Sequence, residues 1–263
     1  MKGLNSKEDK CPVCGESLFT KIKWLGQERY SAVACACERK KKDNEMDWLL
    51  VKEQRQSLLA RYSRISIVDA KALTETFNKA VIDDENRELY QMIKYYCQHF
   101  DEAMKENTGL YIFGERGRGK SFIANAVYNW LKKDYTVLLI NLNMYSNMLK
   151  KGYEVKKERE IELLEATRKA DLLVIDDIGT EILSEWLTEK IFNLVNYREI
   201  VRKPLIITSN LNYADLEQKF KEYDEHTRIK SRIQGMCLDL ELKGPDRREN
   251  PEKFNWLIDG VMK

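Results

Sequence analysis

The segment from Gly109 to Ser121 constrains the fold of this chain more than any other stretch. Gly109 to Phe113 is short, apolar and rich in β-forming residues, and Gly-Glu-Arg-Gly-Arg-Gly-Lys-Ser follows it at once, from Gly114 to Ser121. The next residues, 122–133, have the apolar spacing of an amphipathic helix. A strand, a GxxxxGKS loop and a helix in this order predict a P-loop that binds ATP or GTP.

The residue types of this loop suit a phosphate chain. Glycines let successive backbone N–H groups face phosphate oxygens, and the N-terminus of the following helix adds its dipole. We expect Lys120 to reach the β- and γ-phosphates and Ser121 to bind Mg²⁺. The residues predicted to bind the nucleotide are Gly114, Glu115, Arg116, Gly117, Arg118, Gly119, Lys120, Ser121 and Phe122.

A second apolar run, Leu172 to Ile175, ends in the two carboxylates Asp176 and Asp177. This is the Walker B pattern, because the carboxyl ends of parallel strands lie at the ligand-binding edge of an α/β sheet. Asp176 is predicted to hold Mg²⁺ through water, and Asp177 to orient the attacking water. Since Asp is one methylene shorter than Glu, we expect slow intrinsic hydrolysis.

A third run ends in the polar tip Thr208-Ser-Asn210, where Asn210 or Thr208 would lie beside the γ-phosphate. Two more apolar runs, 136–141 and 236–240, bring the number of expected strands to five. Because the five runs alternate with helical stretches, the fold class predicted is α/β with a parallel five-stranded sheet.

Composition and charge exclude several classes of protein. The 45 Lys and Arg residues nearly balance the 43 Asp and Glu residues, for a net charge of +2, which excludes a protein that coats a polyanion. No apolar run approaches the length of a membrane span. The N-terminus has no apolar signal core, so we expect a cytoplasmic protein without a membrane partner.

Four of the six cysteines, Cys11, Cys14, Cys35 and Cys37, lie near the N-terminus. A CxxC and a CxC separated by about 20 residues predict a tetrahedral Zn²⁺ site, which is structural because four thiolates leave no open position. The alternating pattern between the pairs predicts a hairpin. Disulfides, which are rare in the cytosol, and a redox dithiol are the alternatives.

Residues 38–61 contain neither Gly nor Pro, and their apolar residues recur among charged ones. This pattern predicts a long amphipathic helix. We therefore expect a zinc-binding module (residues 1–42), a helical connector (43–75) and an ATPase domain (76–263).

Together these motifs resemble the AAA+ ATPases of the DnaC/DnaI/IstB-like family. The matching segments are 114–121, 172–179, 206–210 and the Arg-Ile-Lys-Ser-Arg-Ile box at 228–233. The resemblance covers residues 77–248 and implies an AAA+ core. Because only about 30 residues follow Arg232, too few for a full helical lid, we expect a reduced lid.

The resemblance also implies roles for arginines. Arg232 resembles the arginine finger that reaches the nucleotide of a neighbouring subunit, and Arg228 would support it. Hydrolysis would then require self-association through the ATP interface. Arg248, or Arg247 beside it, resembles the sensor 2 arginine. The alternative for Arg228 and Arg232 is an ordinary surface helix face.

Contacts to single-stranded DNA are implied at two places. Lys150 and Lys151 lie at the bend of the insert between the expected strands at 136–141 and 172–175, and with Tyr145 they suit a groove of cations and stacking rings. The alternative for them is a solvated helix turn. Ser184 and Trp186 fall where the family contacts single-stranded DNA. Ser184 is equally a candidate helix N-cap, and Trp186 a candidate core residue.

The function predicted is an ATP-dependent loader of a hexameric replicative helicase onto single-stranded DNA during replication initiation. The ATP state would control assembly and release, with ATP, Mg²⁺ and Zn²⁺ as cofactors. The zinc module, together with the connector, would bind the helicase. The alternative is an IstB-like ATPase helper of a DNA transposase. A small-molecule P-loop kinase is a weaker candidate, since it leaves the Ser-Arg-Ile box unexplained.

Overall fold

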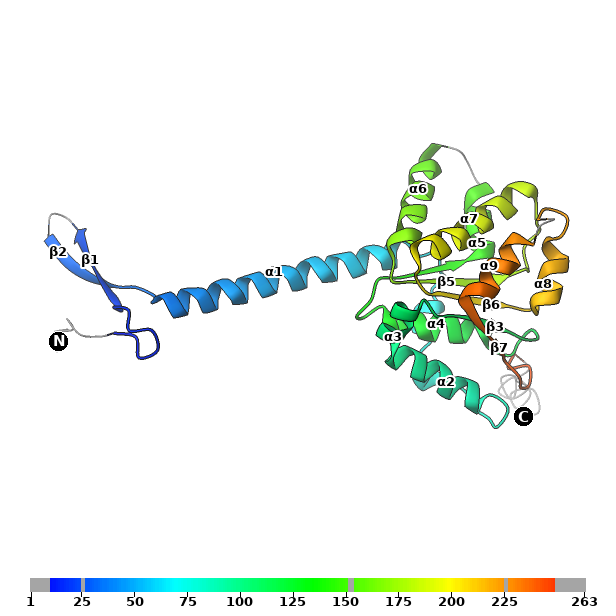
Figure 1. Cartoon of the computed structure of the whole chain (residues 1–263), viewed down its shortest axis with the longest axis horizontal. Coiled ribbons are helices and arrows are strands. Elements are labelled where there is room, and N and C mark those ends of the chain that lie inside the picture. The colour runs from blue at the N-terminus through cyan, green and yellow to red at the C-terminus, as the bar shows by residue number, and fades with distance from the viewer. Residues whose placement is uncertain (1–9, 25–26, 151–153, 225–226, 249–263) are drawn as a thin grey trace, which may run out of the picture. The chain divides into compact units, whose positions relative to one another are not determined.

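A computed structural model of the chain describes residues 10–24, 27–150, 154–224 and 227–248. The chain divides into two compact units, Met1–Ser57 and Leu58–Lys263 (Figure 1). The division falls within the long helix α1 (Ala36–Ile65). Within the described residues, no helix is both long and apolar enough to cross a membrane.

The first unit is built on an antiparallel hairpin of β1 (Phe19–Trp24) and β2 (Gln27–Ala32). Ile22 lies opposite Arg29 in the register of the two strands. Helix α1 begins one residue after Cys35. The predicted hairpin and the predicted long helix are both confirmed, and the two cysteine pairs flank the hairpin.

The second unit contains a five-stranded sheet in the order β4-β5-β6-β3-β7. All neighbouring strands in it are parallel, so the five predicted strands and their direction are confirmed. Their bounds are β3 (Gly109–Phe113), β4 (Val137–Asn141), β5 (Leu172–Ile178), β6 (Leu205–Ser209) and β7 (Cys237–Glu241). Strand β6 separates the strand that leads to the P-loop from the strand that carries the two aspartates.

Helices cover both faces of this sheet (Figure 1). One face packs against α2 (Arg87–Gln98), α3 (Phe100–Glu106) and α4 (Lys120–Leu131). The other packs against α5 (Leu142–Lys150), α6 (Glu154–Lys169), α7 (Glu185–Val201), α8 (Tyr213–Phe220) and α9 (Arg228–Met236). Short 3₁₀ helices at Ala72–Thr74 and Phe77–Lys79 precede α2.

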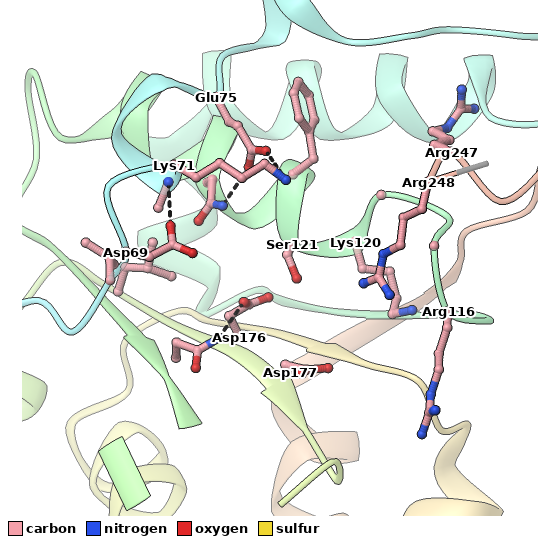
Figure 2. A pocket seen from close by; sticks show the side chains of 18 of the residues that line it. Asp69, Lys71, Glu75, Arg116, Lys120, Ser121, Asp176, Asp177, Arg247 and Arg248 are labelled. Carbon is pink, nitrogen blue, oxygen red and sulfur yellow. Dashed lines mark hydrogen bonds and ion pairs between the residues drawn. The ribbon is translucent and has the colours of Figure 1, made fainter. Parts of the chain in front are cut away.

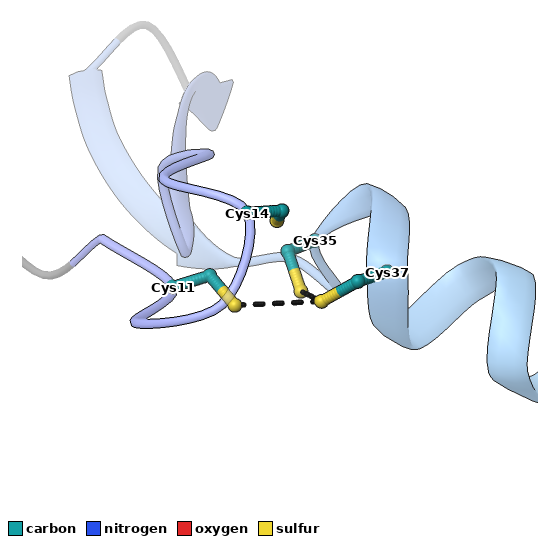
Figure 3. A group of neighbouring side chains, drawn as sticks. All are labelled: Cys11, Cys14, Cys35 and Cys37. Carbon is teal, nitrogen blue, oxygen red and sulfur yellow. Dashed lines mark hydrogen bonds between the residues drawn. The ribbon is translucent and has the colours of Figure 1, made fainter.

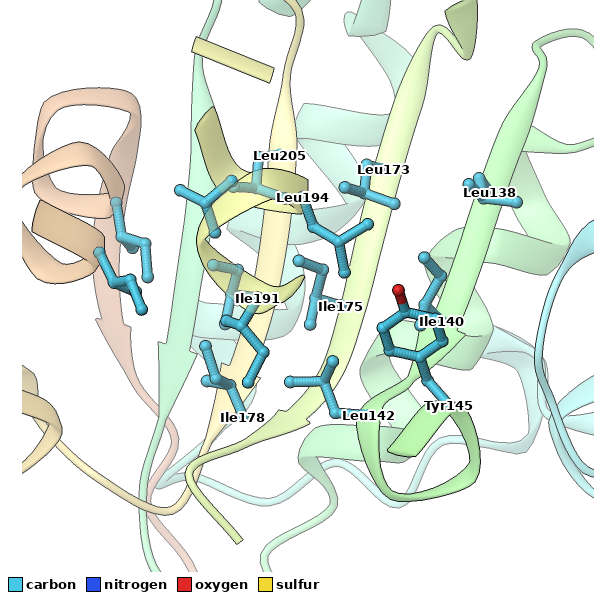
Figure 4. Packing of buried hydrophobic residues seen from close by; sticks show 14 of the residues in the cluster. Leu138, Ile140, Leu142, Tyr145, Leu173, Ile175, Ile178, Ile191, Leu194 and Leu205 are labelled. Atoms are coloured by element: carbon cyan, nitrogen blue, oxygen red, sulfur yellow. The ribbon is translucent and has the colours of Figure 1, made fainter. Parts of the chain in front are cut away.

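Strand residues alternate between the two cores, as the period of two requires. Leu173 and Ile175 face α7 in one core, and Leu172 and Val174 face the opposite core. Figure 4 shows Ile191 and Leu194 of α7 above this part of the sheet. Because strand β5 is buried on both faces, its first four residues, Leu172 to Ile175, are all apolar, and the two aspartates follow them near the end of the strand.

Tyr145 of α5 is fully buried in this core, beside Ile140 (Figure 4). The prediction that its ring is available for stacking on DNA is therefore wrong. The apolar face of α5 packs on the sheet, and the ring lies on that face.

Arg198 of α7 is a cation at the centre of the fold, and its exposed fraction is 0%. Its guanidinium donates hydrogen bonds of 2.7–3.0 Å to the carbonyl oxygens of Thr167, Ala170, Asp171 and Pro204. These carbonyls belong to the end of α6 and to the segments that enter β5 and β6. Arg198 thus ties the entry of the Walker B strand to its neighbour, and burial lowers its pKa to about 10.

Candidate nucleotide site and cysteine cluster

The predicted P-loop forms a tight turn between β3 and α4. Gly117 and Gly119 have φ angles of +78° and +103°, in the left-handed region that favours glycine. A Cβ atom on Gly117 would lie 1.8 Å from Oδ1 of Asp246, so the loop and the segment after β7 approach as closely as glycine allows. The Arg247 N–H donates to the Gly117 carbonyl at 3.0 Å.

Lys120 begins helix α4 and is 6% exposed. Its ammonium donates hydrogen bonds of 2.7 Å to the carbonyl oxygens of Gly114 and Glu115. Burial lowers its pKa to about 8. The lysine is therefore held against the loop, in a site that favours the arrival of negative charge.

Asp176 lies at the end of β5 and is 6% exposed. One carboxylate oxygen accepts a 2.6 Å hydrogen bond from the Thr208 hydroxyl, and the other accepts from Asn141 Nδ2 at 3.1 Å. Burial raises its pKa. A buried carboxylate with two fixed donors is suited to a cation ligand sphere, because a cation would favour its ionised form.

Asp177 adopts a left-handed backbone conformation, with φ +68°, at an irregularity in the pairing of β5 with β6. Its N–H donates to the Thr208 hydroxyl at 2.9 Å. Its carboxylate Oδ2 accepts from Thr180 at 3.0 Å and from Asn143 at 3.4 Å. Asp tolerates positive φ better than most residues, since its short side chain bonds locally, which accounts for Asp at this position.

A cavity of about 650 Å³ joins these parts, and Figure 2 shows Lys120, Asp176 and Asp177 around it. Of the predicted residues, those that line it are Arg116, Gly117, Gly119, Lys120, Ser121, Phe122, Asp176, Asp177, Asn210, Arg247 and Arg248. Gly114, Glu115 and Arg118 are not in this lining; the last two form an ion pair. Arg247 forms an ion pair with Asp83 at 2.5 Å.

One wall of the cavity comes from residues 68–90, which sequence reasoning did not include. Val68, Lys71, Glu75 and Tyr90 line it, and Glu75 accepts a 2.7 Å hydrogen bond from Asn125 of α4. Ile67 pairs with Ile140 at the sheet edge and so brings this segment to the site. The sequence carries no local signal for this contact, which depends on the tertiary packing of distant segments.

Arg228 and Arg232 of α9 lie outside the lining of the cavity in their own chain. Both guanidinium groups lie over the ring of Phe192 on α7, at 4.7 and 4.8 Å from its centroid. Glu181 is also outside the lining; it is 3% exposed and accepts from the Gly179 N–H at 3.0 Å. Glu181 thus stabilises the turn after β5.

Ser184 caps α7, because its hydroxyl accepts from the Leu187 N–H at 3.2 Å. Trp186 is 42% exposed, so it is not a core residue, and the ammonium of Lys190 lies 5.7 Å from its ring centroid. The side chain of Lys150, and all of Lys151, lie outside the described residues. The same ammonium forms an ion pair with Glu160 at 2.6 Å, so the exposed indole is the part of this surface on which a base can stack.

The four N-terminal cysteines converge, as predicted (Figure 3). Their sulfur atoms lie within 4.8 Å of one another, with 3.1 Å between Cys35 and Cys37 and 3.4 Å between Cys11 and Cys37. Thiolates bound at about 2.3 Å to one tetrahedral metal lie about 3.8 Å apart, so the cluster fits such an ion. Backbone N–H groups of Cys14 and Val13 lower the pKa of Cys11 to about 6, whereas hydrogen bonds with Cys35 and Cys11 raise the pKa of Cys37. The fit to a metal ion therefore rests on the positions of the four sulfur atoms.

This chain is similar to several known proteins. The family described as IstB-like ATP binding protein matches residues 44–253. The replicative helicase loader DnaI of Bacillus subtilis is 25% identical over 207 residues, which cover 75% of this chain and 64% of the relative. The helicase loader DnaC of Buchnera aphidicola is 28% identical over 148 residues, covering 55% and 58%. The chain thus spans less than two thirds of the length of either relative.

Among solved structures, a crystal structure of DnaI has a TM-score of 0.58 at 23% identity, covering 70% of this chain and 95% of that one. This likeness supports the AAA+ fold that the sheet order and the P-loop already indicate.

Proposed function

Because the chain belongs to the IstB-like ATP-binding protein family, we propose that it hydrolyses ATP to control the loading of a replicative helicase onto single-stranded DNA. The observation that carries the ATPase part is the convergence of Lys120, Asp176, Asp177 and Asn210 on one cavity. The helicase part rests on the similarity to two replicative helicase loaders.

The chemistry follows from the positions of these groups. Lys120 would neutralise charge on the β- and γ-phosphates, and the backbone N–H groups of the loop would hold their oxygens. Asp177, fixed by Thr180 and Asn143, would orient the attacking water. Mg²⁺, held by Ser121 and through water by Asp176, would offset the phosphate charge. Hydrolysis would be slow in a single chain, because Arg232 would act on the nucleotide of a neighbouring copy.

The cysteine cluster supports a structural Zn²⁺ ion in the first unit. The hairpin offers few buried apolar residues: among its described residues, none of β1 or β2 is fully buried. A metal ion would therefore supply stability that a core does not. We assign this unit the contact with the hexameric helicase.

Single-stranded DNA would bind over the exposed ring of Trp186. An aromatic ring stacks on any base. The alternative function, a helper of a DNA transposase, uses the same ATPase core. It predicts a preference for duplex DNA and for a transposase as partner.

The test is helicase loading with purified proteins. The chain, the hexameric replicative helicase of the same cell and circular single-stranded DNA are mixed with ATP, and DNA-bound helicase is measured. We expect loading to require ATP and to be lost in Lys120→Ala. The matched control is Lys133→Ala, since Lys133 is exposed in the turn that follows α4, outside the cavity lining. Absence of helicase binding, with binding to a transposase instead, would refute the loader function.

A further inference from the structure

Two arginines of α9 meet one face of α7. Arg228 and Arg232 are four residues apart, and Phe192, Asn196 and Glu199 are spaced by four and three, so each set lies on one side of its helix. Packing of α7 against α9 brings the two sets together, with both guanidinium groups over the Phe192 ring.

Arg232 is held at its inner edge. Its Nε–H donates to Asn196 Oδ1 at 3.0 Å and lies 2.9 Å from Glu199 Oε2. The ring of Phe192, 4.8 Å from the guanidinium carbon, limits rotation of the guanidinium plane. Nη1 makes a long 3.4 Å contact with the Arg228 carbonyl, and Nη2 donates to none of the residues that the structure describes.

Arg228 is fixed separately. Its Nε–H donates to Asp224 Oδ1 at 2.9 Å, and the other Asp224 oxygen accepts from the Ile229 N–H at 2.8 Å. Asp224 is 2% exposed, so this carboxylate both begins α9 and balances the charge of Arg228. The two arginines therefore lie over one ring but have separate hydrogen-bond partners, Asp224 for Arg228 and Asn196 for Arg232.

From this geometry we propose that Phe192 and Asn196 are positioning residues for Arg232, holding its outer amino group toward the nucleotide of a neighbouring copy. The proposal rests on the function proposed above, in which Arg232 acts on that nucleotide. An unrestrained arginine side chain loses much rotamer freedom when it binds a phosphate. A guanidinium that the protein already holds in one orientation loses less. Asn196 is a neutral acceptor, so it orients the Arg232 guanidinium without offsetting its positive charge.

Glu199 also contacts Arg232, but we do not expect it to position the guanidinium. Its side chain is 47% exposed, so its ion pair with Arg232 is screened by water and weak. We therefore expect Glu199→Gln to change the rate less than threefold. A larger increase would mean that the ion pair holds Arg232 away from its target, and it would overturn the proposal.

The first experiment measures ATPase activity at saturating ATP and single-stranded DNA. We expect Asn196→Ala and Phe192→Leu to lower kcat about tenfold, equivalent to about 1.4 kcal/mol, with an unchanged KM for ATP. Phe192→Tyr keeps the ring and should restore the rate. Glu189→Ala, on an exposed part of the same helix, is the control. A normal kcat in both Asn196→Ala and Phe192→Leu would overturn the proposal.

The second experiment separates positioning from general damage. The Asn196→Ala variant is mixed with the Asp177→Asn variant, which lacks the Asp177 carboxylate but has an intact Arg232. If Asn196 acts through Arg232 in trans, the mixture is more active than the sum of its parts, as it should be for Arg232→Ala. Rescue of Arg232→Ala without rescue of Asn196→Ala would overturn this inference alone. A normal rate in Arg232→Ala itself would instead refute the trans role in the proposed function.

Discussion

Replacing Thr208 with valine tests the arrangement at the centre of the site. The Thr208 side chain is 1% exposed, and its hydroxyl both donates to Asp176 at 2.6 Å and accepts from the Asp177 N–H at 2.9 Å. Valine has nearly the same shape but neither donates nor accepts. The change therefore removes two hydrogen bonds and opens almost no cavity.

The magnitude follows from these two bonds. A hydrogen bond to a buried carboxylate contributes about 1.5–3 kcal/mol, and a buried N–H left without a partner costs about 1–3 kcal/mol. Neither contribution is reduced for exposure, because Thr208 and Asp176 are both buried. We expect Thr208→Val to lower the free energy of unfolding by about 3 kcal/mol. Thr208→Ser keeps the hydroxyl and should lose only about 1 kcal/mol, for one methyl group.

Urea denaturation followed by far-UV circular dichroism measures the difference. With a slope of about 2–3 kcal/mol per molar urea, the midpoint of Thr208→Val should fall by about 1–1.5 M. The same variant should hydrolyse ATP more slowly, because it loses the hydrogen bond from the Asp177 N–H to residue 208, which holds Asp177 at positive φ. If valine and serine variants lose equal stability, the hydroxyl is not the stabilising group and the reasoning fails.

Three more predictions follow from the described geometry. Because the pKa of Lys120 is lowered to about 8 and phosphate favours the ammonium, the Kd for ATP should be flat below about pH 7. It should then rise up to about tenfold per pH unit above pH 8; a flat titration to about pH 9.5 would contradict this. Cys35→Ser should reduce bound zinc from about one ion per chain, measured by mass spectrometry, whereas the buried thiol control Cys97→Ser should not. Trp186→Ala should weaken binding of single-stranded DNA by about 1–3 kcal/mol in fluorescence anisotropy, and Trp186→Phe should weaken it less. Equal affinities of the alanine variant and the wild type would exclude the indole as a stacking platform.

Local patterns were sufficient for most of the fold. The five strands are short continuous apolar runs, and the hairpin and the long helix are runs whose period reports the structure directly. The convergence of the cysteines was also predictable, because ligand spacing is a property of the chain. The burial of Tyr145 was not predictable, because an aromatic residue near lysines in the sequence is equally consistent with a surface ring and with the buried face of a helix.

Sequence by itself determined the nucleotide loop, the pair of aspartates and the family, since each depends on residue types at fixed short spacings. The tertiary structure decided which distant groups share a site. Strand order alone places Thr208 between the P-loop and Asp176, and edge pairing at Ile67 brings Glu75 to the cavity. Packing of α7 on α9 seats Arg232 over Phe192, and packing of α7 on the sheet buries Arg198 among four carbonyls. These contacts join segments tens of residues apart, and no periodicity in a chain encodes which of its surfaces will meet.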